Sequence, residues 1–447
     1  MPSESILAQA IAEQATPLQG ASTDFDLLLE RIGDARFVLL GEATHGTHDF
    51  YRIRAELTKR LIREKGFAAV ACEADWPDAY RVNRYIRGVG RDIESVDSLV
   101  EFRRFPQWMW RNADVLDLVG WLRNHNDEIR EAKYRVGFYG LDLYSLHSSM
   151  AAVLAYLDEH DADAARRARE RYGCFDAFGE EPQQYGHAIS MGLAPDCEHE
   201  VLGQLVDLLK RRNVLLRHDG VIAEDALFEA EQNARVVAHA EEYYRSMYVR
   251  GVSTWNLRDT HMADTLDALS AHIERRGRSG KIIVWAHNSH VGDSSAMAHR
   301  SERDEITIGH LCRERHPEDT VLVGFTTYDG TVTAASDWGG EAERKAVRPA
   351  LPNSYEALFH RTGVPSFLLL LDNLGEVTAA LHESRIERAI GVIYRPQTER
   401  WSHYFDVRLA DQLDAVIHVD RTRALEPLER TSIWERGELP ETYPSGL

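Results

Sequence analysis

Short apolar segments recur along the chain, and each has the length and composition of a buried strand. They are rich in β-branched and aromatic residues and are apolar on both faces, which is typical of strands in a parallel sheet covered on both sides. The segments are Phe37–Leu40, Ala68–Cys72, Tyr134–Tyr139, Lys281–Trp285, Val321–Thr326, Ser366–Leu371, Ala389–Tyr394 and Ala415–Val419.

Helical spacing separates several of these strands. In Asp49–Glu64, for example, Ile53, Leu57 and Leu61 recur every four residues on one helix face. Alternation of strands and helices predicts an α/β fold with a mostly parallel central sheet flanked by helices. The segment Thr326–Ala334, with Tyr-Asp-Gly at its centre, predicts a hairpin added to this core.

The segment Ser145–Gly280 differs from the rest because it contains no convincing strand. It contains long charged helical patterns, such as Ala164–Tyr172, Glu198–Arg212 and Ala226–Tyr248. We interpret residues 145–280 as a helical insertion or cap within an α/β domain. The chain has no fixed-period repeat and no Pro/Ser-rich linker, so we expect one domain spanning residues 1–447.

Charge narrows the class of partner. The 447 residues include 52 Lys and Arg and 72 Asp and Glu, which gives a formal net charge of −20. An acidic surface repels phosphate backbones and anionic lipids, so we expect neither nucleic acid nor membrane as a partner. The first basic residue is Arg31, and no apolar run approaches the roughly 20 residues of a membrane span, so we expect a cytoplasmic protein.

The four cysteines are Cys72, Cys174, Cys197 and Cys312. They lie far apart and form no CxxC pair, so we predict reduced thiols and neither a disulfide framework nor a structural zinc site. The sequence does not indicate an oligomeric state.

Titratable side chains follow three of the predicted strands. Glu42 and His45 lie in the Gly41–Thr47 loop after the first strand, Glu73 ends the second, and His287 and His290 follow the fourth. Loops after the carboxyl ends of parallel strands carry the active site in α/β proteins. We therefore expect these five side chains to meet at one rim, where clustered titratable groups favour acid–base chemistry.

Neighbouring residues extend this candidate site. Arg54, in the helix after the first loop, and Arg258, at the start of a later helix, could stabilise an oxyanion. Asp75 and Trp76 follow Glu73 directly, and we expect them to bind substrate together with Arg258. An aromatic cluster suggests a substrate with an apolar face: Phe102, Phe105, Trp108 and Trp110, with Trp401–Phe405 as a further contributor.

Missing motifs limit the reaction type. The chain has no G-x-S-x-G elbow, P-loop, G-x-G-x-x-G or H-E-x-x-H signature. Cys72 lies inside a strand, which favours a core role. The remaining possibility is a histidine that acts as a general base on water and is oriented by carboxylates. We expect no metal or other cofactor.

Five features along the chain carry a family resemblance. They are Gly41-Glu42-Ala43-Thr44-His45-Gly46, Arg54, Cys72-Glu73, Asn256-x-Arg258-Asp259-x-x-Met262-Ala263 and Trp285-Ala286-His287-Asn288-x-His290-Val291. Together they resemble the erythromycin esterase family over nearly the whole chain, from about Asp24 to about Pro427. Thr44 and Gly46 around the histidine match its broader, less characterised branch.

The resemblance implies a central sheet with an inserted helical region and, in the best-known members, metal-independent cleavage of the lactone ester of macrocyclic antibiotics. By motif, His45 would be the general base that activates water, and Glu42 and Glu73 would position His45 and the water. The groups that would shape the site and assist the carbonyl oxygen or leaving alcohol are His287, His290 and Arg54, with Arg258 as part of its helix motif.

Two other functions fit the same residues. Two glutamates and three histidines could bind a divalent cation, as in a metal-dependent hydrolase or peptidase. Alternatively, the cleft could belong to a non-catalytic biosynthetic accessory protein. The leading hypothesis is a hydrolase of a small-molecule ester or lactone.

Overall fold

A central sheet of eight strands organises the molecule. The computed structural model describes residues 3–179, 181–215, 220–297, 304–372 and 375–437. In spatial order the strands are β1 (Thr16–Pro17), β9 (Ser366–Leu370), β12 (Ala415–Val419), β6 (Thr320–Thr326), β2 (Phe37–Leu40), β5 (Ile282–Trp285), β3 (Ala69–Asp75) and β4 (Gly137–Asp142). Strands β12 to β4 pair in parallel, and β9 and β1 add antiparallel pairs at one edge. The predicted α/β class is therefore confirmed.

Alternate residues of each strand enter two separate cores, because successive side chains point to opposite faces of a sheet. In β2, Val38 and Leu40 join the core under helices α2 (Asp26–Ile32), α3 (His48–Lys65) and α5 (Ala113–Asp127). Phe37 and Leu39 join the core on the other face. The helices of that face are α1 (Glu4–Gln14), α11 (Thr254–Arg275), α14 (Ile308–Arg315), α15 (Tyr355–His360) and α16 (Glu376–Leu381).

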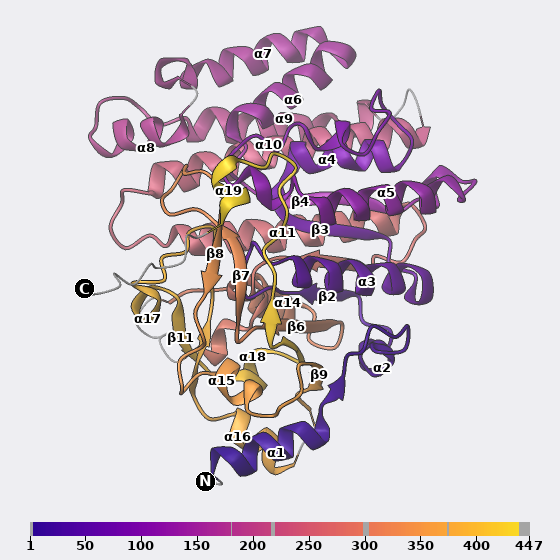
Figure 1. Ribbon diagram of the computed structural model, residues 1–447. Helices are drawn as coiled ribbons and strands as arrows, with labels where there is room; N and C mark the ends of the chain where they lie inside the picture. The colour runs from indigo at the N-terminus through magenta and orange to yellow at the C-terminus, as the bar shows by residue number, and fades with distance from the viewer. Residues whose placement is uncertain (1–2, 180, 216–219, 298–303, 373–374, 438–447) are drawn as a thin grey trace.

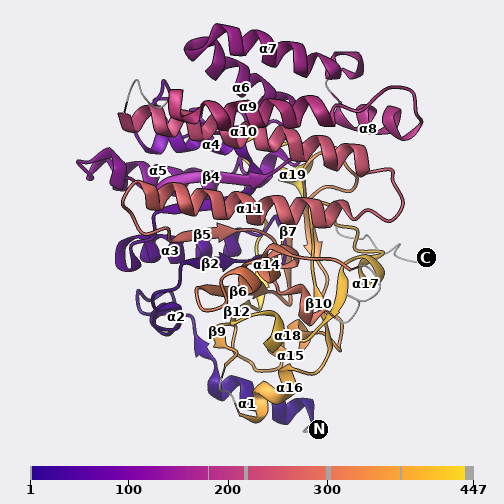
Figure 2. The same cartoon turned by 180° about the vertical axis from the view of Figure 1, so that it is seen from behind.

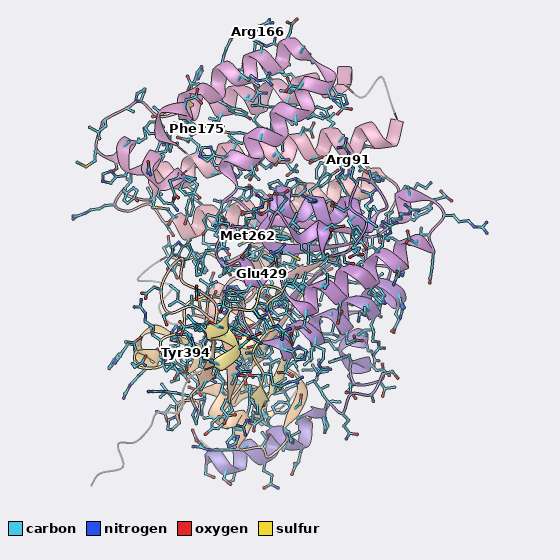
Figure 3. The ribbon with its side chains drawn as sticks, turned by 45° about the horizontal axis from the view of Figure 1, so that its top comes forward. Arg91, Arg166, Phe175, Met262, Tyr394 and Glu429 are labelled. Carbon is cyan, nitrogen blue, oxygen red and sulfur yellow. A yellow bond between two sulfur atoms is a disulfide. The ribbon has the colours of Figure 1, made fainter. Side chains whose placement is uncertain are left out.

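The described residues between β4 and α11 are mostly helical and form a layer at one end of the molecule (Figures 1 and 2). This layer has its own apolar core, which includes Phe175, whereas Met262 of α11 belongs to a core of the sheet; both are labelled in Figure 3. Its helices are α6 (Leu146–His160), α7 (Ala162–Tyr172), α8 (Pro182–Ser190), α9 (Glu198–Leu215) and α10 (Gly220–Ser246). Helix α4 (Trp76–Ile86) lies between this layer and the sheet edge at β4.

The C-terminal part adds two small sheets and short helices. Strand β7 (Asp329–Ala334) pairs with β8 (Glu343–Val347) and β13 (Arg421–Thr422), and β10 (Arg385–Arg388) pairs with β11 (Tyr404–Val407). The short helices are α12 (Asn288–Val291), α17 (Glu399–Ser402), α18 (Leu409–Gln412) and α19 (Ser432–Arg436).

Two strand-level predictions are wrong. The predicted hairpin Thr326–Ala334 does not form, because β7 pairs with β8 across a longer loop and not with β6. The segment Ala389–Tyr394 is not a strand, although it is apolar. Its main chain bonds to loops instead: the Ile390 amide donates to the Ala43 carbonyl, and the Tyr394 amide donates to the Ala335 carbonyl.

The cysteine prediction is also corrected. Cys174 and Cys197, 23 residues apart, form a disulfide within the helical layer, with their Cα atoms 6.0 Å apart. Cys72 and Cys312 are buried free thiols, as predicted. The pairing had no local signal because packing of the layer, and not sequence proximity, brings the first two cysteines together.

Within the described ranges, no helix combines the length and apolar composition needed to cross a bilayer.

Candidate active site

The carboxyl ends of four neighbouring strands meet at one cavity of about 470 Å³. The strands are β2, β5, β3 and β4, and the loop after each contributes side chains to the wall. The acidic, basic and histidine lining residues are His45, Glu73, Asp75, Asp78, Arg104, Asp142, Arg258, His287, His290 and His403. The predicted convergence of strand ends is therefore present, with Glu42 one layer behind the wall.

His45 is held by a buried chain of polar contacts. Its Nδ1 lies 2.9 Å from Glu42 Oε1, and Arg54 Nη2 donates to Glu42 Oε2 at 2.5 Å. A carboxylate oxygen accepts, so the contact with Glu42 assigns a proton to His45 Nδ1. Nε2 then carries the lone pair, and no described residue hydrogen-bonds to it. Arg54 is buried against Tyr51 and Trp285 and does not line the cavity, so its predicted place at the rim is wrong.

The loop that carries Glu42 and His45 requires glycine at two places. A Cβ at Gly41 would lie 2.2 Å from Asn288 Oδ1, and one at Gly46 would lie 1.8 Å from the Thr333 carbonyl oxygen. Both approaches are possible only without a side chain. The glycines therefore let the loop pack between α12 and β7, which fixes the direction of His45.

Glu73 and Asp142 both accept hydrogen bonds from the Arg258 guanidinium. Arg258 Nη2 donates to Glu73 Oε1 and to Asp142 Oδ2, at 2.7 Å each, and Arg258 Nε donates to Asp142 Oδ1 at 3.0 Å. The other Glu73 oxygen accepts from the His287 amide at 2.9 Å. Burial would raise the pKa of the Glu73 carboxyl, but the His290 and Arg258 charges outweigh it and hold that pKa well below its usual range.

His290 lies between two carboxylates and an aromatic ring. Its Nδ1 is 2.9 Å from Asp259 Oδ2, its Nε2 is 3.5 Å from Glu73 Oε1, and its ring stacks on Trp255 at 4.3 Å between centroids. Burial would lower the pKa of His290, but the Asp259 and Glu73 charges raise it overall. In the neutral form, Nε2 instead accepts from Arg258 Nη1 at 3.0 Å.

His287 stands beside His45, with 4.8 Å between the ring centroids. The Ser289 amide donates to His287 Nδ1 at 3.2 Å, so the network assigns the proton to Nε2. That Nε2 is buried and lacks a hydrogen bond of good geometry in the described chain, although the ring lies close enough to the Ala43 main chain to interact with it. Burial and the neighbouring His45 lower the pKa of His287 to about 3, which keeps the ring neutral near pH 7.

The side chains of Asp75 and Trp76 point to different places. Asp75 lines the cavity, and its Oδ2 accepts from Arg104 Nε at 2.9 Å, while its buried Oδ1 has no partner in the described chain. Trp76 points into the sheet core, where it stacks on Tyr139, so the prediction that it binds substrate is wrong. Arg258, the third predicted binding residue, does line the cavity.

Asp78 and Arg104 had not been singled out from the sequence. Burial and the nearby Asp75 charge raise the pKa of Asp78 to about 8. Asp142 was also missed, although it has the signal used elsewhere, a carboxylate at a strand end. Asp259 stands inside the quoted Arg258 motif without an assigned role.

Aromatic rings supply the apolar part of the wall. Of the predicted cluster, Phe102, Phe105 and Trp110 line the cavity, whereas Trp108 does not. Trp401 is 82% exposed, and only Ser402 and His403 of its segment reach the wall. Three further rings were not expected: Tyr144, Trp255 and Trp338.

Among the residues with described positions, no group of three or more His, Cys, Asp and Glu side chains has a metal-binding arrangement. His45 and His290 instead pair with Glu42 and Asp259, and the Glu73 oxygens are engaged by Arg258 and a main-chain amide.

The fold and the cavity define a class: an α/β protein with histidine–carboxylate pairs at the carboxyl edge of a mostly parallel sheet. The erythromycin esterase family model matches residues 62–422, and the chain belongs to this family. The match includes Glu73, Arg258, His287 and His290 and begins after His45. Family membership supports a hydrolase that acts on an ester of a small molecule.

Known proteins resemble the chain over most of its length at low identity. Erythromycin esterase type II of Escherichia coli is 21% identical over 373 residues, which cover 79% of this chain and 84% of that protein. The putative hydrolase YbfO of Bacillus subtilis is 20% identical over 432 residues, 92% of this chain and 90% of that protein. A mutant erythromycin esterase in its open conformation has a TM-score of 0.67 at 18% identity, covering 95% of this chain and 98% of its own, which shows a shared fold.

Proposed function

We propose that this protein hydrolyses a carboxylic ester or lactone by general-base activation of water at His45. One observation carries the proposal. His45 Nδ1 is bonded to the buried Glu42 carboxylate, which leaves the Nε2 lone pair at the wall of a large cavity. A base held in one tautomer by a carboxylate is the arrangement that general-base catalysis requires.

The proposed reaction needs only this chain and water. His45 Nε2 takes a proton from water, and the resulting hydroxide attacks the ester carbonyl carbon. The carbonyl oxygen becomes an oxyanion, which accepts a hydrogen bond from His287 Nε2–H. When the intermediate collapses, the carbon–alkoxide bond breaks and the alkoxide takes the proton from His45. General-base help contributes about 10²–10⁴-fold, and one oxyanion donor about 10²–10³-fold.

The remaining charged groups hold these two histidines in place. Glu73 fixes the His287 main chain through its amide. Arg258 links Glu73 to Asp142 and His290, so that the ends of β3, β4 and β5 share one ionic network. We propose that Arg54 acts at one remove, by holding the Glu42 carboxylate toward His45.

The cavity suggests the size and polarity of the substrate. A volume of about 470 Å³ suits a drug-sized molecule, and the rings of Phe102, Phe105, Trp110 and Trp338 offer it an apolar surface. Macrolide lactones are therefore one class to test. We interpret residues 145–280 as a helical cap within a single domain, because Tyr144, directly before this segment, and Arg258 of α11, within it, both reach the cavity.

The test is a hydrolysis screen over esters and lactones, macrolides included, with His45→Ala as the inactive variant. His48→Ala is the matched control, because His48 also bonds a carboxylate through Nδ1, at 2.9 Å from Asp114, but does not line the cavity. Loss of turnover in the first variant only supports the proposal. Turnover retained in His45→Ala would reject it.

The same screen separates the two alternatives. A metal at one per chain, with activity lost on chelation and restored by metal, would indicate a metal-dependent hydrolase. Tight binding of an ester without turnover by the wild-type protein would indicate an accessory protein.

A second mechanism has one observation in its favour. Ser289 lines the cavity, and its Oγ lies 2.8 Å from His287 Nδ1, as in a serine nucleophile with its base. The low pKa of His287, about 3, makes it a poor proton acceptor at neutral pH, so water attack is favoured. Ser289→Ala should therefore retain most activity. Its inactivation, with an acyl-enzyme burst in the wild type, would favour the serine mechanism.

A further inference from the structure

A second concentration of charge lies at the opposite edge of the sheet, where the parallel strands begin. It surrounds a small cavity beside Ala68 and Gly137, at the starts of β3 and β4. The cavity leaves about 10 Å³ for the centre of a water-sized sphere. Its polar lining residues are Arg87, Lys133, Arg135, Tyr139, Arg276 and Arg278.

The cations around this cavity exceed their carboxylate partners. Asp225 is shared by Arg87, at 3.0 Å, and by Arg276. Lys133 is paired with Glu131 at 3.2 Å. Of the five cations that line the cavity, three thus contact two carboxylates, in a chain whose formal net charge is −20.

Two of the arginines donate to main-chain carbonyls in place of carboxylates. Arg135 Nη1 donates to the Arg87 carbonyl at 2.6 Å, and Arg278 Nη1 donates to the Arg135 carbonyl at 2.8 Å. Carbonyl oxygens orient a guanidinium but leave its charge uncompensated. The positive potential of the cavity is therefore fixed by the fold.

A buried donor without a partner belongs to a residue of the cavity lining. The Arg276 side chain is 7% exposed, and its Nε has no acceptor among the described residues. Tyr139 also lines the cavity, and its ring is buried. Burial lowers the pKa of Arg278 to about 10, and the Arg87 and Arg276 charges add to this effect. An anion in the cavity would accept a hydrogen bond from the unpaired donor and would reduce the repulsion among the cations.

We propose that this cavity binds one chloride-sized anion. Its free volume is about that of one water molecule, which favours a monatomic anion over a tetrahedral oxyanion such as phosphate. The donors would be the guanidinium groups of Arg276 and Arg278 and the Tyr139 hydroxyl. The bound anion would join the end of α11 to the starts of β3 and β4 and so stabilise the contact of α11 with the sheet.

The test compares salts at one ionic strength. Thermal unfolding of the full chain is measured in sodium chloride, sodium bromide, sodium gluconate and sodium phosphate. A ligand that binds only the folded state raises Tm, and we expect about 2 °C in chloride and bromide relative to gluconate. Arg278→Gln should remove this difference. Arg166→Gln should keep it, because Arg166 lies at the outer surface of α7 (Figure 3).

Crystals of the wild-type protein soaked in bromide give a second readout that does not depend on a variant folding. An anomalous peak within hydrogen-bond distance of Arg276 or Arg278 supports the site. Equal Tm values in all four salts together with no bromide peak would overturn the proposal and leave water as the occupant. Stabilisation by phosphate alone would also overturn it, because the size argument would then be wrong.

Discussion

The buried pair Glu42–Arg54 offers a test that separates stability from catalysis. Glu42→Gln keeps the shape of the side chain and its acceptor oxygen toward His45 Nδ1, but removes the charge. Arg54 then stays buried with its positive charge but without a carboxylate partner, since Glu42 is the carboxylate it contacts in the described part of the chain. Arg54→Met removes the cation and leaves the Glu42 charge facing His45 alone.

The expected cost follows from burial. Removing one partner of a buried ion pair costs about 3–5 kcal/mol, because an uncompensated charge remains in the interior. In Glu42→Gln the guanidinium keeps its contacts with the Tyr51 and Trp285 rings, at 4.4 and 4.5 Å, and such contacts are worth up to about 2 kcal/mol when desolvated. We therefore expect Glu42→Gln to lower the free energy of unfolding by about 3 kcal/mol, near the lower end of this range.

The double variant Glu42→Gln/Arg54→Met contains no unpaired charge. Its loss of stability should be smaller than the sum of the single losses by at least about 2 kcal/mol. Its activity should not recover. Both variants that lack the Glu42 charge should show kcat/KM reduced by about 10²–10⁴-fold, because no carboxylate stabilises the protonated His45.

Stability is measured by urea unfolding followed by tryptophan fluorescence, and activity by hydrolysis of whichever ester the wild type turns over. Strictly additive losses of stability would refute the view that the pair is a buried, mutually compensating unit. Recovery of activity in the double variant would refute the role of Glu42 beside His45.

Three further predictions concern other groups. Burial and the Glu356 charge raise the pKa of Glu387 from 4.5 to about 8, so the folded state keeps a proton that the unfolded state releases. The free energy of unfolding should therefore fall between about pH 4.5 and 8, by up to about 1.4 kcal/mol per pH unit. Glu387→Gln should flatten this slope in urea titrations at several pH values, and an unchanged slope would contradict the assignment. His287→Ala should lower kcat about 10²–10³-fold with little change in KM, and an effect on KM alone would exclude an oxyanion contact. Reduction of the Cys174–Cys197 disulfide should destabilise the helical layer by about 3 kcal/mol from loop entropy, measured as hydrogen exchange in α6 to α10, and unchanged exchange would show that packing alone holds the layer.

Much of the sheet follows from local pattern. Strands β2 and β12 begin and end at the predicted residues, because a short apolar run buried on both faces is a purely local signal. Ala389–Tyr394 carries the same signal but lies where loops from both halves of the chain meet, so its main chain finds other partners. Hydropathy alone does not distinguish these two environments.

The site was predictable as far as strand direction determines it. Glu73, His45 and His287 come together because parallel strands end at the same edge. Asp142 was missed for a positional reason: the third strand was predicted at Tyr134–Tyr139, but β4 ends at Asp142, so the carboxylate was not recognised as a strand-end residue.

Side chains on helices were the harder part. Arg54 and Trp76 are close in sequence to the right loops, yet both point into the interior. Their direction depends on how α3 and α4 rotate against the sheet, which residue spacing does not fix. Arg104 reaches Asp75 from an irregular segment, for which no pattern existed.

The cavity wall has two parts, one that carries the proposed chemistry and one that would contact the substrate. The groups to which we assign proton transfer stand on the sheet edge and are held by two ionic networks, Glu42–Arg54 and the contacts of Arg258, so most changes there would be costly. Phe105 and Trp338, by contrast, pair with each other at 5.0 Å on loops outside those networks. Relatives could thus acquire new substrates during evolution by exchanging these rings, while inheriting the same chemistry unaltered.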